Sequence, residues 1–318
     1  MTRVRISILG GPGSGKSTFI GSLADGLDRR AIDGINRYCL PENASVLRQL
    51  TDPLLDGRYP DHTAMSTRTL IDLELDVRVR EEVTRVKLDL ADFGGEQIQH
   101  LFKNRTTSWT DDWQAQREAS SYCLFVQLDQ MPTSGAATLK RNSPTQPRGE
   151  HRHAEQLASD QASQPESVYG PGARHEPDRP PPAHSDGPVL VPKLLDLIEV
   201  LQFIRHHRGL DPAERPPPGT QRVAVLFSAW DRFDSTFGPE RALREGAPLL
   251  ADYCWANFQP EDVMAFGLSA TGGDLRDESY RKRYLSHPGG FSVREDSRGL
   301  LHRGDVAQPL RWLLFGDV

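Results

Sequence analysis

The sequence predicts an α/β protein with three layers, in which helices cover both faces of a mostly parallel sheet and one antiparallel strand lies at its edge. Three observations lead to this class. Short apolar runs typical of buried strands recur along the chain, helical patterns separate them, and a glycine-rich turn joins the first strand to the first helix. Strands that alternate with helices form parallel sheets because each connection crosses the sheet through a helix.

The first strand is expected over residues 3–9, where apolar and polar side chains alternate, and the first helix over about 16–29. Between them lies Gly10-Gly11-Pro12-Gly13-Ser14-Gly15-Lys16-Ser17, which has the full G-x-x-x-x-G-K-[ST] spacing of a phosphate-binding loop. Glycines let successive backbone N–H groups face phosphate oxygens, and the following helix adds the positive end of its dipole. A turn that binds nothing is the alternative, but the complete spacing and its flanking elements argue against it. We therefore expect a nucleoside triphosphate to bind at Gly11, Pro12, Gly13, Ser14, Gly15, Lys16, Ser17 and Thr18.

Composition narrows the class of protein. The chain has 318 residues and a net charge of −6, which gives no reason to expect nucleic acid or an anionic membrane as a partner. Its three cysteines, Cys39, Cys123 and Cys254, are far apart and are expected to be reduced thiols in or near the core. Because the N-terminal residues lead directly into the first expected strand, we expect no signal peptide, and no apolar run approaches the roughly 18 to 20 residues of a membrane span. A cytoplasmic protein is the expectation.

The first half of the chain continues with a helix and a hairpin. Leucine spacing predicts a helix over residues 44–55, at a place where a minimal nucleotide-binding domain has only a loop. Residues 70–79 and 83–91 alternate with period two and are expected to pair as a hairpin, whose first strand lies at the sheet edge. Their charged positions are expected to face solvent rather than to act in catalysis.

The middle of the chain changes in character. Residues 132–188 hold ten of the 24 prolines and almost no large apolar side chains. Such a segment buries too little surface to offset its ordering entropy. We therefore expect a disordered insertion over 132–188, with residues 1–131 and 189–318 forming the two parts of one domain.

Further elements complete the expected sheet. The strands are predicted over residues 121–128, 222–228 and 262–268, the helices over 189–207, 239–257 and 306–315, and a loop over 272–303.

Two strand ends carry groups suited to the phosphates and the metal. Asp92 follows a strand, where a carboxylate that organises Mg²⁺ is needed, and Gly95 can offer its N–H to the γ-phosphate. Ser17 supplies the second expected metal ligand.

Two later strand ends point to the base. Asp231 follows one buried strand, and Ser269-Ala270-Thr271 follows the next. Ligands of open α/β sheets bind at the carboxyl ends of strands. A carboxylate accepts hydrogen bonds from N1–H and the exocyclic amine of guanine, a donor pair that adenine lacks, and the Ala270 N–H can meet guanine O6. A turn or cap role is the alternative for Asp231.

These motifs, in this order, resemble those of the Ras-like (TRAFAC-class) P-loop GTPases, and most of all the bacterial double-GTPase-type proteins. The resemblance covers about residues 1–131 and 189–318. It implies a Mg²⁺-dependent GTP-binding switch that hydrolyses GTP to GDP and phosphate, with Lys16, Gly95 and Glu96 as the catalytic residues. It also implies a switch threonine that binds the metal, for which Thr63 is the first choice and Thr67 and Thr69 are the rivals.

Departures from the family pattern qualify these expectations. Ala229 stands where the family has a lysine that packs on guanine, Thr271 stands where it has a second lysine, and Glu96 replaces the water-positioning glutamine. We expect slow turnover. Arg58, Arg68 and Arg105 are candidates for a catalytic arginine, although surface positions are the simpler expectation for all three.

Two other functions stay open from the sequence. One is a nucleotide-regulated scaffold that hardly hydrolyses GTP, and the other is a P-loop ATPase or small-molecule kinase. A protein effector or activator that contacts the loops around 57–69 and 92–110 is the expected partner.

Overall fold

The computed structural model describes residues 2–39, 44–61, 69–79, 81–92, 119–127, 193–209, 214–233 and 238–316. All of these belong to one compact unit, formed by Met1–Asn142 and Val191–Val318. The second unit, Ser143–Leu190, lies outside the described residues. The insertion expected over 132–188 therefore stays a prediction.

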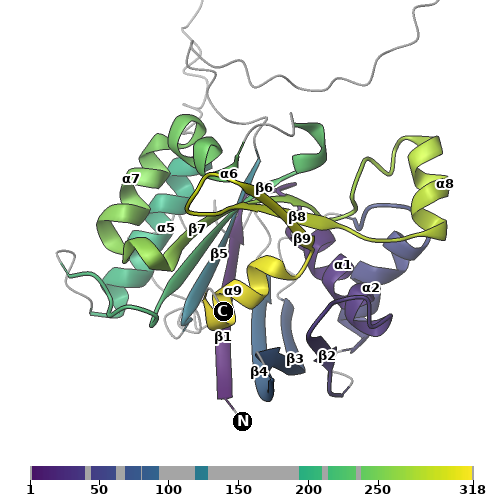
Figure 1. The fold of residues 1–318 in the computed structure, drawn as a ribbon, viewed down its shortest axis with the longest axis horizontal. Coiled ribbons are helices and arrows are strands. Elements are labelled where there is room, and N and C mark those ends of the chain that lie inside the picture. Colours follow the sequence, from purple (N-terminus) through teal and green to yellow (C-terminus); the bar gives the residue numbers. More distant parts are fainter. Residues whose placement is uncertain are drawn as a thin grey trace, which may run out of the picture. The chain divides into compact units, whose positions relative to one another are not determined.

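A single sheet runs through the described unit in the order β2-β3-β4-β1-β5-β6-β7-β8-β9 (Figure 1). The five central strands, β4, β1, β5, β6 and β7, are parallel, while the two strands at each end pair antiparallel. The bounds are β1 (Thr2–Gly10), β2 (Ile35–Arg37), β3 (Thr69–Val79), β4 (Glu82–Asp92), β5 (Ser121–Gln127), β6 (Arg222–Ser228), β7 (Val263–Ser269), β8 (Phe291–Glu295) and β9 (Leu301–Asp305). The predicted α/β class with a mostly parallel sheet is confirmed.

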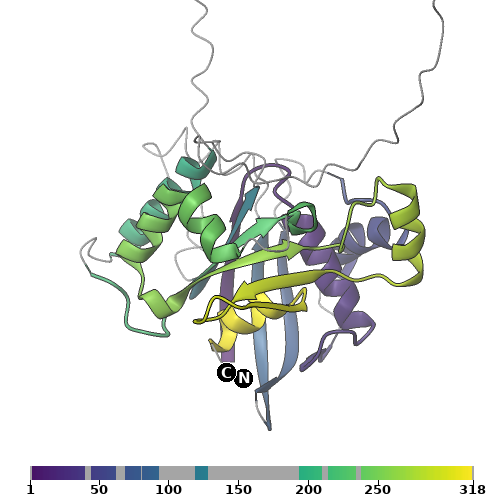
Figure 2. The same ribbon diagram turned by 45° about the horizontal axis from the view of Figure 1, so that its top comes forward.

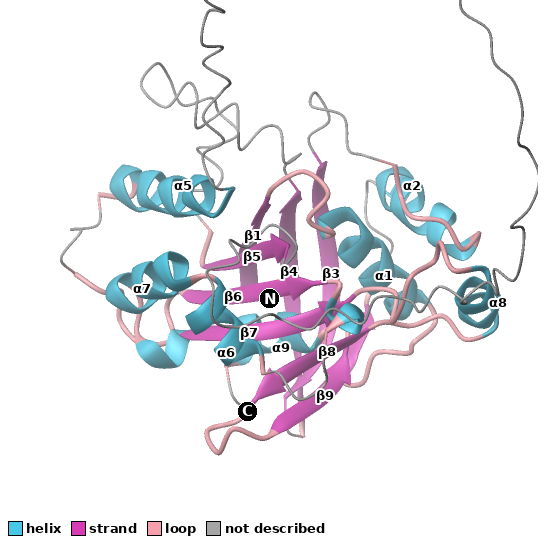
Figure 3. Cartoon of the chain, turned by 90° about the horizontal axis from the view of Figure 1, so that it is seen from above, coloured by secondary structure: helices cyan, strands magenta, loops and turns pink. Residues whose placement is uncertain are grey.

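Helices cover both faces of the sheet, as Figures 1 and 2 show from two directions. Helices α5 and α7 lie together on one side, whereas α1, α2 and α8 lie on the other, and the view from above in Figure 3 agrees. The helices are α1 (Lys16–Asp28), α2 (Ala44–Leu55), α5 (Lys193–His207), α6 (Pro239–Arg241), α7 (Pro248–Asn257), α8 (Glu278–Ser286) and α9 (Gln308–Phe315). Short turns of other helical types are η2 (Trp230–Arg232), η3 (Ala242–Gly246) and η4 (Pro260–Asp262).

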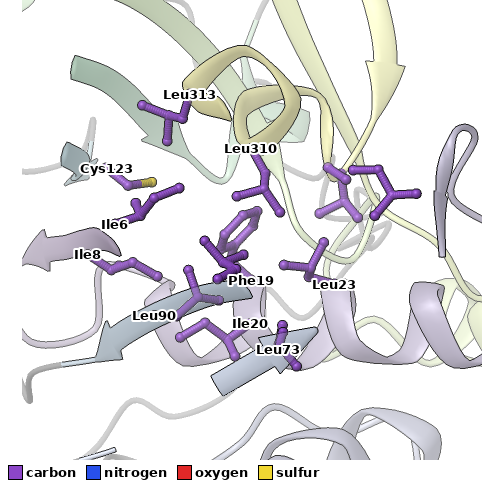
Figure 4. Packing of buried hydrophobic residues seen from close by; sticks show 14 of the residues in the cluster. Ile6, Ile8, Phe19, Ile20, Leu23, Leu73, Leu90, Cys123, Leu310 and Leu313 are labelled. Atoms are coloured by element: carbon purple, nitrogen blue, oxygen red, sulfur yellow. The ribbon is translucent and has the colours of Figure 1, made fainter. Parts of the chain in front are cut away.

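The core has one apolar layer on each face of the sheet, and β5 contributes to both. Tyr122 and Leu124 belong to the cluster beneath α5 and α7, while Cys123 and Phe125 belong to the cluster beneath α1 and α9. Figure 4 shows part of the second cluster, including Phe19 of α1. The ring centroids of Phe19 and Phe125 lie 5.5 Å apart. Burial on both faces explains why β5 is almost continuously apolar. This packing holds the carboxyl end of β5 beside the glycine-rich loop.

In the β3–β4 hairpin, the charged side chains that the structure describes on the expected solvent face are partly exposed, namely Asp72, Glu74, Asp76 and Lys87. Arg85 pairs with Asp76 at 2.8 Å, and Lys87 pairs with Asp72 at 3.6 Å. The expectation that β3 forms the sheet edge is wrong, because the three-residue strand β2 pairs on its outer side. So short a strand leaves no periodic pattern in the sequence.

Three further expectations are wrong. Residues 272–303 are not a loop, since they contain α8, β8 and the start of β9. Their apolar content is low because α8 buries only Tyr284 and β9 is mostly exposed. The helix expected over 239–257 is interrupted at Ala247, which has φ −133° and precedes Pro248. Cys39 is exposed, whereas Cys123 and Cys254 are buried free thiols.

Candidate nucleotide-binding site

The glycine-rich loop between β1 and α1 requires glycine for steric reasons. Gly13 and Gly15 have φ of +69° and +91°, in the left-handed region that other residues rarely adopt. At Gly10 a Cβ atom would lie 2.7 Å from Ser14 Oγ and 2.8 Å from Phe125 Cβ. The loop therefore folds tightly against the end of β5.

Lys16 is almost fully buried, with 6% of its surface exposed, and its ammonium group lies over the loop. Nζ donates to the Gly10 carbonyl at 2.8 Å, to the Gly11 carbonyl at 3.1 Å and to Ser14 Oγ at 3.3 Å. These acceptors are neutral, so an anionic phosphate oxygen is a stronger partner for the same donor. Half-buried Ser17 and Thr18 follow in the first turn of α1, at the positive end of the helix dipole.

The tips of β5 and β6 adjoin the loop. The Gln127 side-chain amide at the end of β5 donates to the Gly13 carbonyl. A Cβ at Gly15 would lie 3.5 Å from Ser228 Cβ at the end of β6. A pocket opens beside the loop, lined by Gly11, Ser14, Phe125, Val126, Gln127, Leu194 and Leu197. Gln127 was not among the predicted site residues, since its only signal is its place at the end of an apolar strand.

The predicted metal ligands are placed only in part. Ser17 lies in the first turn of α1, and Asp92 is the last residue of β4, paired in register with Ile8 of β1. Asp92 therefore ends β4 close to the point where β1 enters the glycine-rich loop, and Ser17 directly follows that loop. A hydroxyl and a carboxylate are the hard oxygen donors that Mg²⁺ prefers, usually together with phosphate oxygens and water. Thr63, Gly95 and Glu96 lie outside the described residues.

Asp231 lies in the turn η2, which leaves β6 through Ala229 at φ +58°. The neighbouring Trp230 anchors this turn: it is 4% exposed and packs so closely on Gly267 that a Cβ there would come within 2.2 Å of the indole. Ser269 Oγ at the end of β7 donates to Asp231 Oδ1 at 2.5 Å. The buried ring and the serine together hold a half-buried carboxylate in one orientation.

The loop after β7 is held by its carbonyl groups. Ser22 of α1 donates to the Ala270 carbonyl at 2.6 Å, and Tyr280 of α8 donates to the Thr271 carbonyl at 2.7 Å. The Thr271 hydroxyl donates to Gly273 O within the same loop. The Ser22 contact also joins the loop after β7 directly to α1, the helix that follows the glycine-rich loop.

An aspartate that the sequence analysis did not single out joins these loops. Asp274 Oδ2 pairs with Arg232 Nη2 at 2.9 Å, and its Oδ1 accepts from the Tyr59 hydroxyl at 3.2 Å. No motif marks these residues, because they come from three segments that are distant in the sequence.

Within the described ranges, no helix combines the length and the apolar character needed to cross a membrane. The same part of the chain holds no cluster of three or more His, Cys, Asp or Glu residues that could bind a metal.

Comparison with solved structures gives similar chains of low sequence identity. The Arl6 BBS3 small GTPase from Trypanosoma brucei, with a bound nucleotide analogue, is 10% identical, with 90% of this chain and 98% of that chain covered and a TM-score of 0.37. The bacterial selenocysteine-specific elongation factor EF-Sec is 11% identical, with 90% and 29% covered and a TM-score of 0.35. Roco2 RocCORdC from Methanosarcina barkeri, bound to GDP, is 12% identical, with 90% and 49% covered and a TM-score of 0.31.

A comparison with curated proteins gives no match. The model of the family described as Double-GTPase 1 matches residues 7–313, which is nearly the whole chain. The match spans the glycine-rich loop, the end of β4 and the segments that follow β6 and β7. The chain therefore belongs to the Double-GTPase 1 family and is a GTP-binding protein.

Proposed function

We propose that this protein is a switch that binds GTP with Mg²⁺ and hydrolyses it slowly to GDP and phosphate. The main support is the position of Asp231. Its carboxylate is oriented by Ser269, and the loop of Ser269 is hydrogen-bonded to the phosphate-loop helix through Ser22 and Ala270. These two contacts support a complex in which a nucleotide with its phosphates on the loop has its base near the Asp231 carboxylate.

The phosphate end of the proposed complex uses the loop Gly11–Ser17 and Thr18. Lys16 exchanges its carbonyl partners for β- and γ-phosphate oxygens, while N–H groups of the loop and of the first turn of α1 bind the remaining oxygens. When bound, Mg²⁺ neutralises charge that develops between the β- and γ-phosphates. Ser17 and Asp92 are the proposed ligands, with Thr63 as a third in the triphosphate state and Gly95 as a donor to the γ-phosphate.

The base end uses Asp231, Ala270 and the backbone around them. The Asp231 carboxylate accepts from guanine N1–H and from the exocyclic amine, and the Ala270 N–H donates to O6. Ala229 offers no cation to cover the base, and the Thr271 side chain hydrogen-bonds its own loop. We therefore propose that selectivity for guanine rests mainly on the carboxylate.

Hydrolysis is proposed to be slow, because Glu96 would bring a negative charge near the γ-phosphate while it orients the attacking water. A protein activator or effector is proposed to bind the loops that respond to the γ-phosphate, and a cytoplasmic location is part of the same proposal. The loss of the γ-phosphate would release these loops.

The test is a comparison of nucleotide affinities of the purified full chain, freed of nucleotide, with and without Mg²⁺. We expect GTP and GDP to bind far more tightly than ATP and ADP. Equal affinity for guanine and adenine nucleotides would overturn the proposal in favour of an ATPase or kinase. Phosphate release by the wild type and by Lys16→Ala then separates a GTPase from a scaffold that binds GTP without turnover, because only a GTPase shows release that depends on Lys16.

A further inference from the structure

Asp274 is an acceptor shared by three segments of the chain. Its Oδ2 pairs with Arg232 of η2 at 2.9 Å, and its Oδ1 accepts from the Tyr59 hydroxyl at 3.2 Å and from the Arg276 N–H at 3.0 Å. Arg232 directly follows Asp231, and Tyr59 lies shortly before residues 62–68, which contain the expected switch residue Thr63. One carboxylate thus joins the base-side turn, the loop after β7 and the segment that follows α2.

The Tyr59 hydroxyl is fixed in this position from two sides. It donates to Asp274 and accepts from the Leu275 N–H at 3.1 Å. Its ring packs against the apolar cluster of Leu54, Leu275 and Tyr284, which joins α2 to α8. Burial raises the pKa of Tyr59, so the hydroxyl stays protonated at neutral pH and keeps its proton to donate.

The turn that carries Asp231 is short, so its orientation depends on a few contacts. Trp230 holds it toward the core and Ser269 holds the carboxylate from β7. Arg232 is the contact on the solvent side, where it extends to Asp274. Because Ala229 cannot cover the base, few other contacts would hold the base in place if the Asp231 carboxylate shifted.

On the basis of the proposed function, we infer that Asp274 is a positioning residue for guanine recognition. It holds the Asp231 turn through Arg232, and through Tyr59 it links that turn to the segment preceding residues 62–68. Neither Asp274 nor Tyr59 needs to touch the nucleotide for this role.

The test measures selectivity rather than affinity alone. GDP and inosine diphosphate differ only in the exocyclic amine. The dissociation constant of inosine diphosphate divided by that of GDP therefore reports how well the Asp231 carboxylate is placed for that amine. A hydrogen bond to a charged group corresponds to about tenfold to hundredfold in affinity. We expect Asp274→Asn, which keeps the shape but loses the charge opposite Arg232, to lower this ratio by about threefold or more.

The control is Asp56→Asn, which removes a carboxylate that pairs with Arg58 on the surface, in the segment of Tyr59. It should leave the ratio unchanged. A merely structural role for Asp274 would weaken GDP and inosine diphosphate equally, lower the melting temperature and leave the ratio at the wild-type value, and that result would overturn the inference.

The link through Tyr59 has its own test. Tyr59→Phe removes only the hydroxyl, with the exposed Tyr38→Phe as control. If Tyr59 acts through Asp274, then Tyr59→Phe lowers the ratio, and the double variant is no worse than Asp274→Asn alone. Additive effects, or no effect of Tyr59→Phe, would refute the link.

The outcome also separates this inference from the proposed function. If the wild type does not prefer guanine nucleotides, the proposed function fails. If the wild type prefers GDP over inosine diphosphate and Asp274→Asn retains the full ratio, the inference alone fails.

Discussion

Replacing Asp231 with asparagine tests base recognition with a change of one atom. The amide keeps one oxygen acceptor but presents an NH₂ donor where the carboxylate has its second oxygen. Ser269 Oγ can still donate to the remaining oxygen, so the turn held by Trp230 keeps its fold. The variant therefore alters the hydrogen-bonding pattern seen by the base rather than the surrounding structure.

The expected magnitude follows from the bonds that change. Guanine loses one charge-assisted hydrogen bond and places its amine against another donor, and the second bond loses its charge. With about 1.5 to 3 kcal/mol for a bond to a charged group, the sum is about 3 to 4 kcal/mol. Since 1.4 kcal/mol is a factor of ten, GDP should bind several hundredfold more weakly. Xanthine carries a carbonyl in place of the amine, so xanthosine diphosphate should bind more tightly to Asp231→Asn than to the wild type.

The assay is displacement of a fluorescent diphosphate from nucleotide-free protein by GDP and by xanthosine diphosphate. Asp252→Asn, at an exposed position of α7, is the control and should change neither affinity. A loss of GDP affinity below about tenfold, or no gain for xanthosine diphosphate, would refute the assignment of Asp231 as the group that reads the base.

Three other substitutions or titrations follow from the contacts. Lys16→Ala should weaken the binding of GTP more than that of GDP and should abolish phosphate release, because the γ-phosphate loses its cation. Equilibrium binding and single-turnover kinetics measure the two effects. An equal loss of affinity for both nucleotides would contradict this role. The Cβ of Gly267→Ala would overlap the Trp230 ring. The variant should therefore lower the free energy of unfolding by about 1 to 3 kcal/mol in a denaturant titration and weaken GDP binding. An unchanged unfolding midpoint would refute that packing. The pKa of Asp296 is held below its ordinary value of 3.8 by hydrogen bonds, first from His302 and then from the Leu300 N–H. Its contribution to the β8–β9 hairpin is thus present above about pH 4 and lost as the pH falls through the lowered pKa, so an NMR titration of its carboxyl carbon should have a midpoint below 3.8.

The sequence predicted the elements whose patterns arise from burial. Strands β5, β6 and β7 are apolar because both faces are covered, and the loop around Gly13 and Gly15 needs glycine at positive φ. Both features leave residue types at fixed spacing. The carboxyl ends of parallel strands lie at the same end of the sheet. From this rule the ends of β6 and β7 were expected to lie close together, and Asp231 does contact Ser269.

Other features leave no such pattern. Strand β9 is held by pairing with β8 and by a turn in which Asp296 caps two N–H groups, rather than by alternating apolar residues. Asp274 and Gln127 act through partners that only the fold brings near. A single exposed aspartate or glutamine looks the same in the sequence whether it faces water or fixes a loop.

The most direct test is a crystal structure of the protein with GDP and Mg²⁺. With the diphosphate on the loop beside Lys16, guanine N1 and the exocyclic amine should lie within about 3.2 Å of the Asp231 carboxylate oxygens. The metal should lie on the Ser17 hydroxyl. A diphosphate on this loop whose base lies away from Asp231 would contradict the account.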